Sequence, residues 1–305
     1  MFKKQIFRIQ IIVLLFIYSQ RYTFSQNQYP DSLNKTKLKT AIITQASFYV
    51  ACMTYLNYVW YNDTEKVPFH YYRDGKGYNQ IDKFGHTYGS YVYSLASYNW
   101  FRNAGLDKTK SLIIGGSMGL LLQTPIEIFD GIHEGWGFSW TDMLANAAGS
   151  ALVITQEILF DKQLFHYKFS YSHSEYAKSD NGYLGDNYLE GLFYDYNGHT
   201  YWLSTSLNNF VFKDDLPPWL SLAVGYSAGG MFGEFENKLN HKGVSIPPHQ
   251  RYRQFLISPD INWTAIKTKS RLLKGLFFAL NFVKIPAPTL EYNTKGELKG
   301  HFIYF

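Results

Sequence analysis

The sequence predicts an α+β protein in which an N-terminal four-helix bundle is followed by a β-rich C-terminal half. Four long, mostly uncharged segments lie in the first half of the chain, and their length favours helices over strands. From about Phe165 the apolar residues alternate, which is typical of strands. Aromatic residues make up 19% of the chain and charged residues only 17%. Such a composition suits a boundary with lipid, where Tyr and Trp rings meet both hydrocarbon and water.

The first 25 residues have the order of a secretory signal peptide. Lys3, Lys4 and Arg8 precede an apolar run over residues 9–18, and small residues follow at positions 23 and 25. We therefore expect export and a mature chain beginning near Gln26, with a polar leader over residues 26–38. An uncleaved anchor is the alternative, although the apolar run is much shorter than the roughly 20 residues that a span requires.

The helical domain is expected over residues 39–162. Its four apolar segments are Lys39–Tyr61, Phe84–Phe101, Ser111–Ile126 and Leu144–Phe160. The third and fourth are rich in Gly and Ala, and small residues let helix backbones approach closely, as they do in membrane bundles. Tyr, Ser, Thr, Asn and Gln also recur in these segments, so a tightly packed soluble bundle is equally open.

The β-rich domain is expected over residues 163–305. Turn signals such as Asn197-Gly198 and the stretch from Asn293 to Gly296 separate strand-length segments. These segments cover residues 165–176, 199–210, 219–230, 253–264, 272–283 and 297–305. A closed single-chain barrel needs at least about eight strands. The half is therefore an antiparallel sheet with covered edges, or a small outer-membrane-type barrel that includes two further strands.

The last residues, "GHFIYF", close an alternating segment on Phe305. A terminal aromatic residue in this position resembles the sorting signal of outer-membrane β-proteins, which implies the barrel assembly machinery as a partner. An ordinary edge strand at the terminus is the alternative.

Charge and cysteine content exclude two classes of protein. Removal of Lys3, Lys4, Arg8 and Arg21 with the leader lowers the formal net charge from +5 to +1. A nucleic-acid partner is therefore not expected, because it would require a dense positive surface. Cys52 is the single cysteine and lies in an apolar stretch, so we expect a small core residue, no intramolecular disulfide and no lipid-acceptor cysteine at the mature N-terminus.

Polar residues in the helical half form three spaced pairs. Asp82 and His86 are four residues apart at a helix start, and Glu127 and Asp130 are three apart near a helix end. Each spacing places both side chains on one helix face. We expect Asp82, His86, Glu127 and Asp130 to lie within mutual reach, where one imidazole and several carboxylates would suit a divalent metal ion. General acid–base chemistry by His86 with Asp82 and Glu127 is the other use of the same groups.

The third pair, Asp142 and Asn146, is four residues apart at the start of the next helix. If the three helices pack together, all three pairs converge near the same end of the bundle. The third pair also has a structural interpretation. Ser139 is placed to cap the helix while Asp142 completes a capping box, so we assign Asp142, Asn146 and Lys83 to a structural polar cluster. Asp82 also has a structural alternative, because a carboxylate at a helix start is stabilised by the helix dipole.

The motifs "DKFGH", "PIEIFDG" and "GFSWTDMLANAAGS" together resemble the YfiM-like family of predicted periplasmic proteins and, more distantly, VanZ-type membrane proteins. The resemblance covers about residues 80–155 and falls on Asp82, Lys83, His86, Glu127, Asp130, Asp142, Ala145, Asn146 and Gly149. The chain departs from the VanZ pattern at Asp130, where glutamine is usual. These families have no established reaction, so the resemblance implies motif boundaries and an envelope location, without a mechanism.

Two functions follow from the sequence. The first is an accessory protein of the outer membrane or its periplasmic face, with an inner-membrane location as the alternative. Its polar cluster would be a structural network or a metal site, and its partners would be membrane lipid and envelope proteins. The second is a metal-dependent hydrolase that modifies envelope lipid or glycan through activated water. The residues leave open whether the protein is an enzyme.

Overall fold

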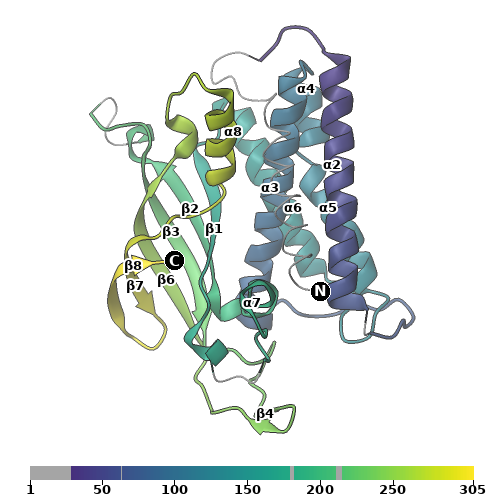
Figure 1. Cartoon of the computed structure of the whole chain (residues 1–305), viewed down its shortest axis with the longest axis vertical. Helices are drawn as coiled ribbons and strands as arrows, with labels where there is room; N and C mark the ends of the chain where they lie inside the picture. The colour runs from purple at the N-terminus through teal and green to yellow at the C-terminus, as the bar shows by residue number, and fades with distance from the viewer. Residues whose placement is uncertain (1–28, 63, 179–181, 211–214) are drawn as a thin grey trace. The chain divides into compact units, whose positions relative to one another are not determined.

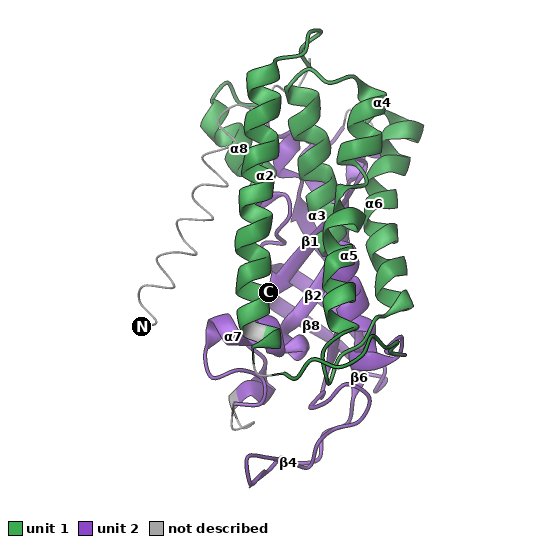
Figure 2. Ribbon diagram, turned by 90° about the vertical axis from the view of Figure 1, so that its right-hand side faces the viewer, with its two compact units in different colours: residues 1–72, 89–162, 267–279 green, residues 73–88, 163–266, 280–305 purple. Residues whose placement is uncertain are grey.

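The computed structural model describes residues 29–62, 64–178, 182–210 and 215–305 (Figure 1). The signal peptide expected over residues 1–25 lies outside this range. The chain forms two compact units (Figure 2). Residues 89–162 and 267–279 belong to the helical unit together with the chain up to Tyr72, whereas residues 73–88, 163–266 and 280–305 form the β unit. Helix α3 (Ile81–Asn103) is continuous, with its first eight residues in the β unit and the rest in the helical unit.

The α+β class is confirmed, and all four expected helices are present. They are α2 (Lys35–Leu56) with a π-helical turn over Asn57–Tyr61, α3, the segment of α4 (Lys108–Lys110) and α5 (Met118–Asp130) joined by a π-helical turn over Ser111–Gly115, and α6 (Trp140–Phe160). Three of them start at polar caps that precede the apolar pattern. The side chains of Asn34, Asp107 and Ser139 accept hydrogen bonds from backbone N–H groups three residues later. Each cap satisfies a first-turn donor that has no partner within the helix.

Serine side chains join α3, α5 and α6 inside the helical unit. Ser90 donates to the Asn146 carbonyl oxygen at 2.5 Å, and the Ser94 and Ser150 hydroxyls lie 2.9 Å apart. Because α5 begins again after the π-helical turn, its first-turn N–H groups need partners. The N–H of Gly119 donates to Ser94 and that of Leu120 to Ser150, each at 3.0 Å. Small residues therefore allow three backbones to lie close together around a polar centre.

Two helical segments are long and apolar enough to cross a membrane by length and composition, Lys108–Asp130 and Trp140–Phe160. Only 33% and 39% of their most apolar windows are buried within the protein. Exposed large apolar side chains on these segments include Ile113, Leu121, Leu144, Ile158 and Leu159. The helical unit thus combines a polar interior with an extensively apolar exterior.

The β unit contains a six-stranded antiparallel sheet in the order β1-β2-β3-β6-β7-β8. Its strands are β1 (Phe165–Tyr171), β2 (His199–Ser206), β3 (Leu220–Gly229), β6 (Tyr252–Ile261), β7 (Ala287–Asn293) and β8 (Leu298–Tyr304). A two-stranded sheet of β4 (Asn240–His241) and β5 (Val244–Ser245) and a short helix α7 (Tyr188–Tyr194) complete the unit. Among the described strands β1 and β8 are edges, so the sheet is open and the barrel alternative is wrong.

The expected strand over residues 272–283 is wrong, because most of this segment is helix α8 (Arg271–Leu280). The Ser270 carbonyl oxygen accepts from the Lys274 N–H at 3.1 Å, and the Ser270 hydroxyl accepts from the Leu273 N–H. These contacts start a helix whose apolar residues at 272, 273, 276 and 280 have helical spacing. The strand that completes the six is β7, for which no strand was expected. Pro286 and Pro288 obscure the start of this strand in the sequence.

The two faces of the six-stranded sheet have inverted polarity. One face buries polar residues, including Ser204, Asp260 and Glu291, together with Trp202. Tyr304 of β8 lies 3.2 Å from the Thr200 hydroxyl of β2 and packs edge-on against Trp202. The sheet is therefore curled around this polar face. We call it the concave face, and the opposite face, which carries exposed apolar side chains, the convex face.

Two buried histidines of the β unit make its stability depend on pH. Burial lowers the pKa of His166 to about 3 and that of His199 to about 4. The unfolded chain binds protons near the ordinary histidine pKa of about 6.5, whereas the folded chain stays neutral until lower pH. The free energy of unfolding should therefore fall as pH decreases from 7 to 5, by an amount on the order of 2 kcal/mol for each histidine.

Urea unfolding of wild type and of His199→Gln at pH 7, 6 and 5 measures this dependence. The variant should lose stability less steeply with decreasing pH, because it lacks one of the two groups. Parallel pH dependences of the two proteins would contradict the assignment.

Candidate functional site

Asp82 and His86 lie on the first two turns of α3. The spacing of four residues places them on one helix face, and His86 Nε2 lies 3.8 Å from Asp82 Oδ1. The His86 side chain is 17% exposed and the Asp82 side chain 26% exposed. Both are therefore accessible from solvent, although most of each side chain is covered.

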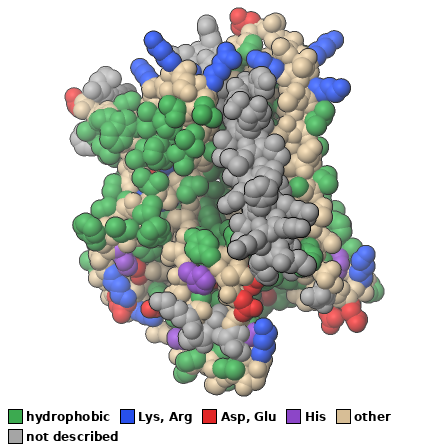
Figure 3. Space-filling model, viewed as in Figure 1, with side chains coloured by type: hydrophobic (Ala, Val, Ile, Leu, Met, Phe, Trp, Pro, Cys, Tyr) green, Lys and Arg blue, Asp and Glu red, His purple; other side chains and the backbone are tan. Residues whose placement is uncertain are grey.

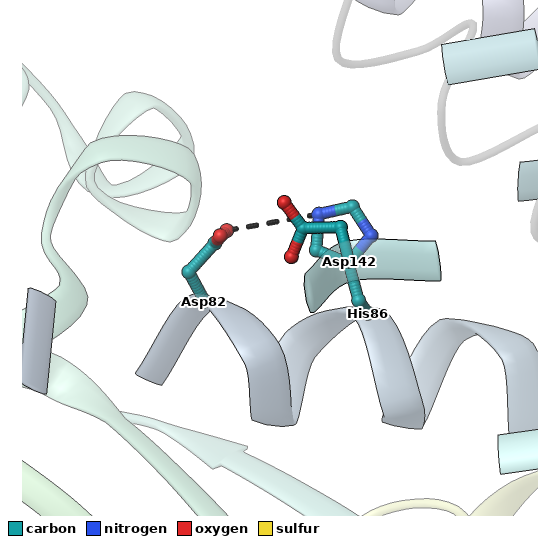
Figure 4. A group of neighbouring side chains, drawn as sticks. All are labelled: Asp82, His86 and Asp142. Carbon is teal, nitrogen blue, oxygen red and sulfur yellow. Dashed lines mark ion pairs between the residues drawn. The ribbon is translucent and has the colours of Figure 1, made fainter. Parts of the chain in front are cut away.

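Asp142 occupies the first turn of α6, and the packing of α6 against α3 brings it near this pair. Ser90 contacts Asn146 and Ser150, so the two helices touch one turn after His86 on α3 and one turn after Asp142 on α6. One ligand atom each from Asp82, His86 and Asp142 lies within 4.8 Å of the other two (Figure 4). Asp142 is the most buried of the three, at 4% exposure.

Lys83 supplies positive charge next to this acidic group. Its ammonium donates to Asp82 Oδ2 at 2.9 Å and to Asp74 Oδ2 at 2.6 Å. The ammonium contacts Oδ2 of Asp82, whereas His86 lies nearest to Oδ1. Lys83 is therefore a positioning residue that fixes the Asp82 carboxylate, and it leaves Asp82 Oδ1 directed to His86.

The donor set fits a divalent transition-metal ion. One imidazole nitrogen and two carboxylates are ligands that zinc and harder divalent ions accept, at bond lengths of about 2.0–2.2 Å. Ligand atoms around such an ion lie about 3–3.5 Å apart. The 3.8 Å separation of His86 and Asp82 is close to this spacing, so small side-chain rotations would complete the coordination. The residues would then hold the ion with further coordination positions available to water.

The second expected pair, Glu127 and Asp130, lies at the end of α5. Glu127 is fully buried. Asp130 accepts a hydrogen bond of 2.5 Å from the Tyr61 hydroxyl, and the Tyr61 ring stacks on His133 at 4.6 Å. Burial, together with the negative charge of Asp130, raises the pKa of Tyr61, so the phenol remains a donor. A role for Glu127 and Asp130 as ligands beside Asp82 and His86 stays a prediction.

Sequence reasoning assigned Asp142 to a helix cap, and the cap is present. The Ser139 hydroxyl accepts from the Asp142 N–H at 3.1 Å. This contact engages the backbone of Asp142 and so is compatible with a ligand role for its carboxylate. The sequence signal for Asp142 is the repeated spacing of four, since Asp142 and Asn146 begin α6 as Asp82 and His86 begin α3. Asp74 was not identified, because it lies in a loop outside every periodic segment.

Part of the chain is similar to a known protein family. Residues 71–157 match the family model DUF2279, described as a predicted periplasmic lipoprotein. The match includes all three motifs of the site but less than a third of the chain. No curated protein and no solved structure matches the chain.

The family description also bears on location. The description names lipoproteins, and the single cysteine of this sequence, Cys52, lies in α2. The expected likeness to periplasmic proteins is confirmed for residues 71–157, whereas the closer likeness to YfiM-like proteins stays a prediction. In this segment the chain is similar to predicted periplasmic lipoproteins, which indicates an exported protein of the cell envelope.

Proposed function

We propose that this chain is an envelope accessory protein that binds a divalent metal ion through Asp82, His86 and Asp142. The observation that carries the proposal is the convergence of three ligand atoms within 4.8 Å from the starts of two helices. Two carboxylates and one neutral imidazole would give a bound divalent ion near-neutral surroundings. The ion would also join α3 to α6 at this end.

The Lys83 ammonium supports the site in the absence of an ion as well. It offsets part of the negative charge of Asp82 and Asp74, which otherwise lie close together. A metal ion therefore adds to an ordered group, and binding requires little rearrangement.

Metal binding is tested by calorimetric titration of the full mature chain with Zn²⁺ and with Mn²⁺. Wild type should bind one ion, and His86→Gln and Asp142→Asn should each weaken binding by more than the roughly 10–100-fold that changes around metal ligands cause. The matched controls are His173→Gln and Asp31→Asn, which change the same residue types elsewhere in the chain. Equal affinity of His86→Gln and wild type would exclude this site.

A hydrolytic function is the second candidate, because three protein ligands leave coordination positions for water. Structural zinc sites usually have four protein ligands, whereas catalytic ones keep an open position. The ion would lower the pKa of bound water, and a neighbouring carboxylate would position that water. Metal-dependent cleavage of a lipid or glycan ester by wild type, lost in Asp142→Asn and kept in Asp31→Asn, would establish this function.

A further inference from the structure

The convex face of the sheet carries continuous rows of apolar side chains. Strand pairing places Leu203 opposite Val224, Val224 opposite Ile257, and Ile257 opposite Leu290. All four side chains are between 36% and 53% exposed. The neighbouring row is aromatic, with Tyr201, Tyr226, Phe255 and Tyr292 in register. Hydrophobic side chains also gather over the strands in the space-filling view (Figure 3).

These rows line a groove of about 500 Å³ within the β unit. Phe84, at the start of α3, forms one wall and stacks on Tyr226 with ring centroids 4.5 Å apart. None of the thirteen lining residues is charged. The volume lies within the range of about 300–1,000 Å³ that is typical of small-molecule sites.

The polarity of the sheet favours lipid as the occupant. A sheet in water normally buries its apolar face and exposes its polar face. Here the concave face buries Ser, Asp and Glu side chains, whereas the convex face buries Tyr201 but exposes its aliphatic row together with Phe255 and Tyr292. Strands with apolar residues outward and polar residues inward are typical of proteins that meet hydrocarbon. The groove therefore has the chemistry of an acyl-chain site.

Arg253 is a charged residue beside the groove, hydrogen-bonded to the lining residue Tyr226. It lies on the same face as Ile257 and Phe255, two residues beyond the aromatic row, because side chains on one face of a strand recur at every second residue. Its Nε donates to the Tyr226 hydroxyl at 3.1 Å, and its Nη2 donates to Gln80 Oε1 at 2.8 Å. All side-chain partners of Arg253 among the described residues are neutral. An anionic group beside Tyr226 would thus meet an arginine whose described side-chain partners, Tyr226 and Gln80, carry no negative charge.

We propose that the groove binds a long-chain fatty acid, with the acyl chain along Leu203, Val224, Ile257 and Leu290 and the carboxylate at Arg253. The guanidinium would donate to the carboxylate oxygens, an arrangement that arginine supports particularly well. The lining residues of the groove are not the proposed metal ligands, and the groove adds a ligand class that the metal proposal does not contain.

The probe for this site is 11-(dansylamino)undecanoic acid, displaced from the full mature chain by palmitic acid or by hexadecanol. Wild type should bind one equivalent of probe and release it to palmitic acid at lower concentration than to hexadecanol. Ile257→Glu should weaken binding of the probe and of both competitors at least 10-fold, and Val244→Glu, an exposed strand residue of β5, should leave all three unchanged. If Ile257→Glu does not fold, Val224→Gln tests binding of the probe to the same groove.

The arginine is tested by the difference between the two competitors. Arg253→Gln should weaken the binding of palmitic acid about 10-fold and leave the binding of hexadecanol unchanged. Arg271→Gln on α8 should change the affinity for neither competitor. Failure of wild type to bind the probe, or equal binding by wild type, Ile257→Glu and Val224→Gln, would overturn the groove proposal. If Arg253→Gln weakened the binding of palmitic acid and of hexadecanol equally, the proposal that Arg253 binds the carboxylate would be overturned. Because no metal is added, these outcomes are independent of the metal titration.

Discussion

Asp260→Asn is expected to lower the free energy of unfolding by about 3–5 kcal/mol, the range for breaking a buried ion pair by removing one partner. Asp260 lies in the concave face of the sheet, where Lys168 Nζ is 2.7 Å and Lys284 Nζ 4.0 Å from its carboxylate oxygens. All three side chains are at most 1% exposed. Removal of the Asp260 charge would leave two ammonium groups buried together. Their other partners in the described part of the chain are carbonyl oxygens and the Trp202 ring.

The loss should depend on pH. Burial already lowers the pKa of Lys168 and of Lys284, and the nearby Asp260 carboxylate counteracts this shift in each. In Asp260→Asn both lysine pKa values should decrease further, so the unfolded chain binds more protons than the folded chain below the ordinary lysine pKa. Stability of the variant then rises with pH. We expect a smaller deficit relative to wild type at pH 9 than at pH 6.

Urea unfolding at pH 6 and pH 9 measures both effects. Glu297→Gln is the control, because it breaks an ion pair with Lys299 in which both side chains are about half exposed. Such pairs contribute little to stability, so the control should unfold like wild type. A deficit for Asp260→Asn no larger than that of Glu297→Gln would contradict a structural role for the buried charges.

Gly119→Ala is expected to lower the free energy of unfolding by about 1–3 kcal/mol or more through overpacking. A Cβ atom at Gly119 would lie 2.0 Å from the Ser90 carbonyl oxygen and 2.5 Å from the Ser90 hydroxyl oxygen. The carbonyl is backbone and cannot rotate away, so α3 and α5 would have to separate. Their separation would also strain the hydrogen bond from the Gly119 N–H to Ser94.

The sign of this effect is informative. Alanine is favoured over glycine in a helix by about 1 kcal/mol, so helix propensity alone would make the variant more stable. Gly300→Ala in strand β8 is the control for adding a methyl group without a clash, since no atom lies within 4 Å of a Cβ at that position. Thermal unfolding should show a clear decrease in Tm for Gly119→Ala and little change for Gly300→Ala. An unchanged or raised Tm for Gly119→Ala would mean that α3 and α5 are not in close contact there.

The helices and most strands could be predicted because their signals are local. Asn34, Asp107 and Ser139 cap helices through contacts three residues away, and the strands from Phe165 to Tyr171 and from His199 to Ser206 have continuous alternation and aromatic content. The start of α8 is also set locally, by Ser270, but its apolar run is short enough to resemble a buried strand. Pro286 precedes strand β7, and Pro288 is its second residue. Only the tertiary structure shows that this segment nevertheless pairs with β6 and β8.

The sequence by itself determined the α+β class, the polar pairs at helix starts and their helical spacing. Asp82 and His86 share a face because the distance between residues i and i+4 is fixed by the helix itself. Only the tertiary structure decided that Asp142 joins them, since this depends on how α3 packs against α6. Tertiary packing likewise decided which face of the sheet is exposed. Alternation along β2 places Trp202 and Ser204 on one face of the sheet and Tyr201 and Leu203 on the other. A period of two does not specify which of these faces is buried. That depends on the curl of the sheet, through which Tyr304 closes over Trp202 and leaves the aliphatic row exposed.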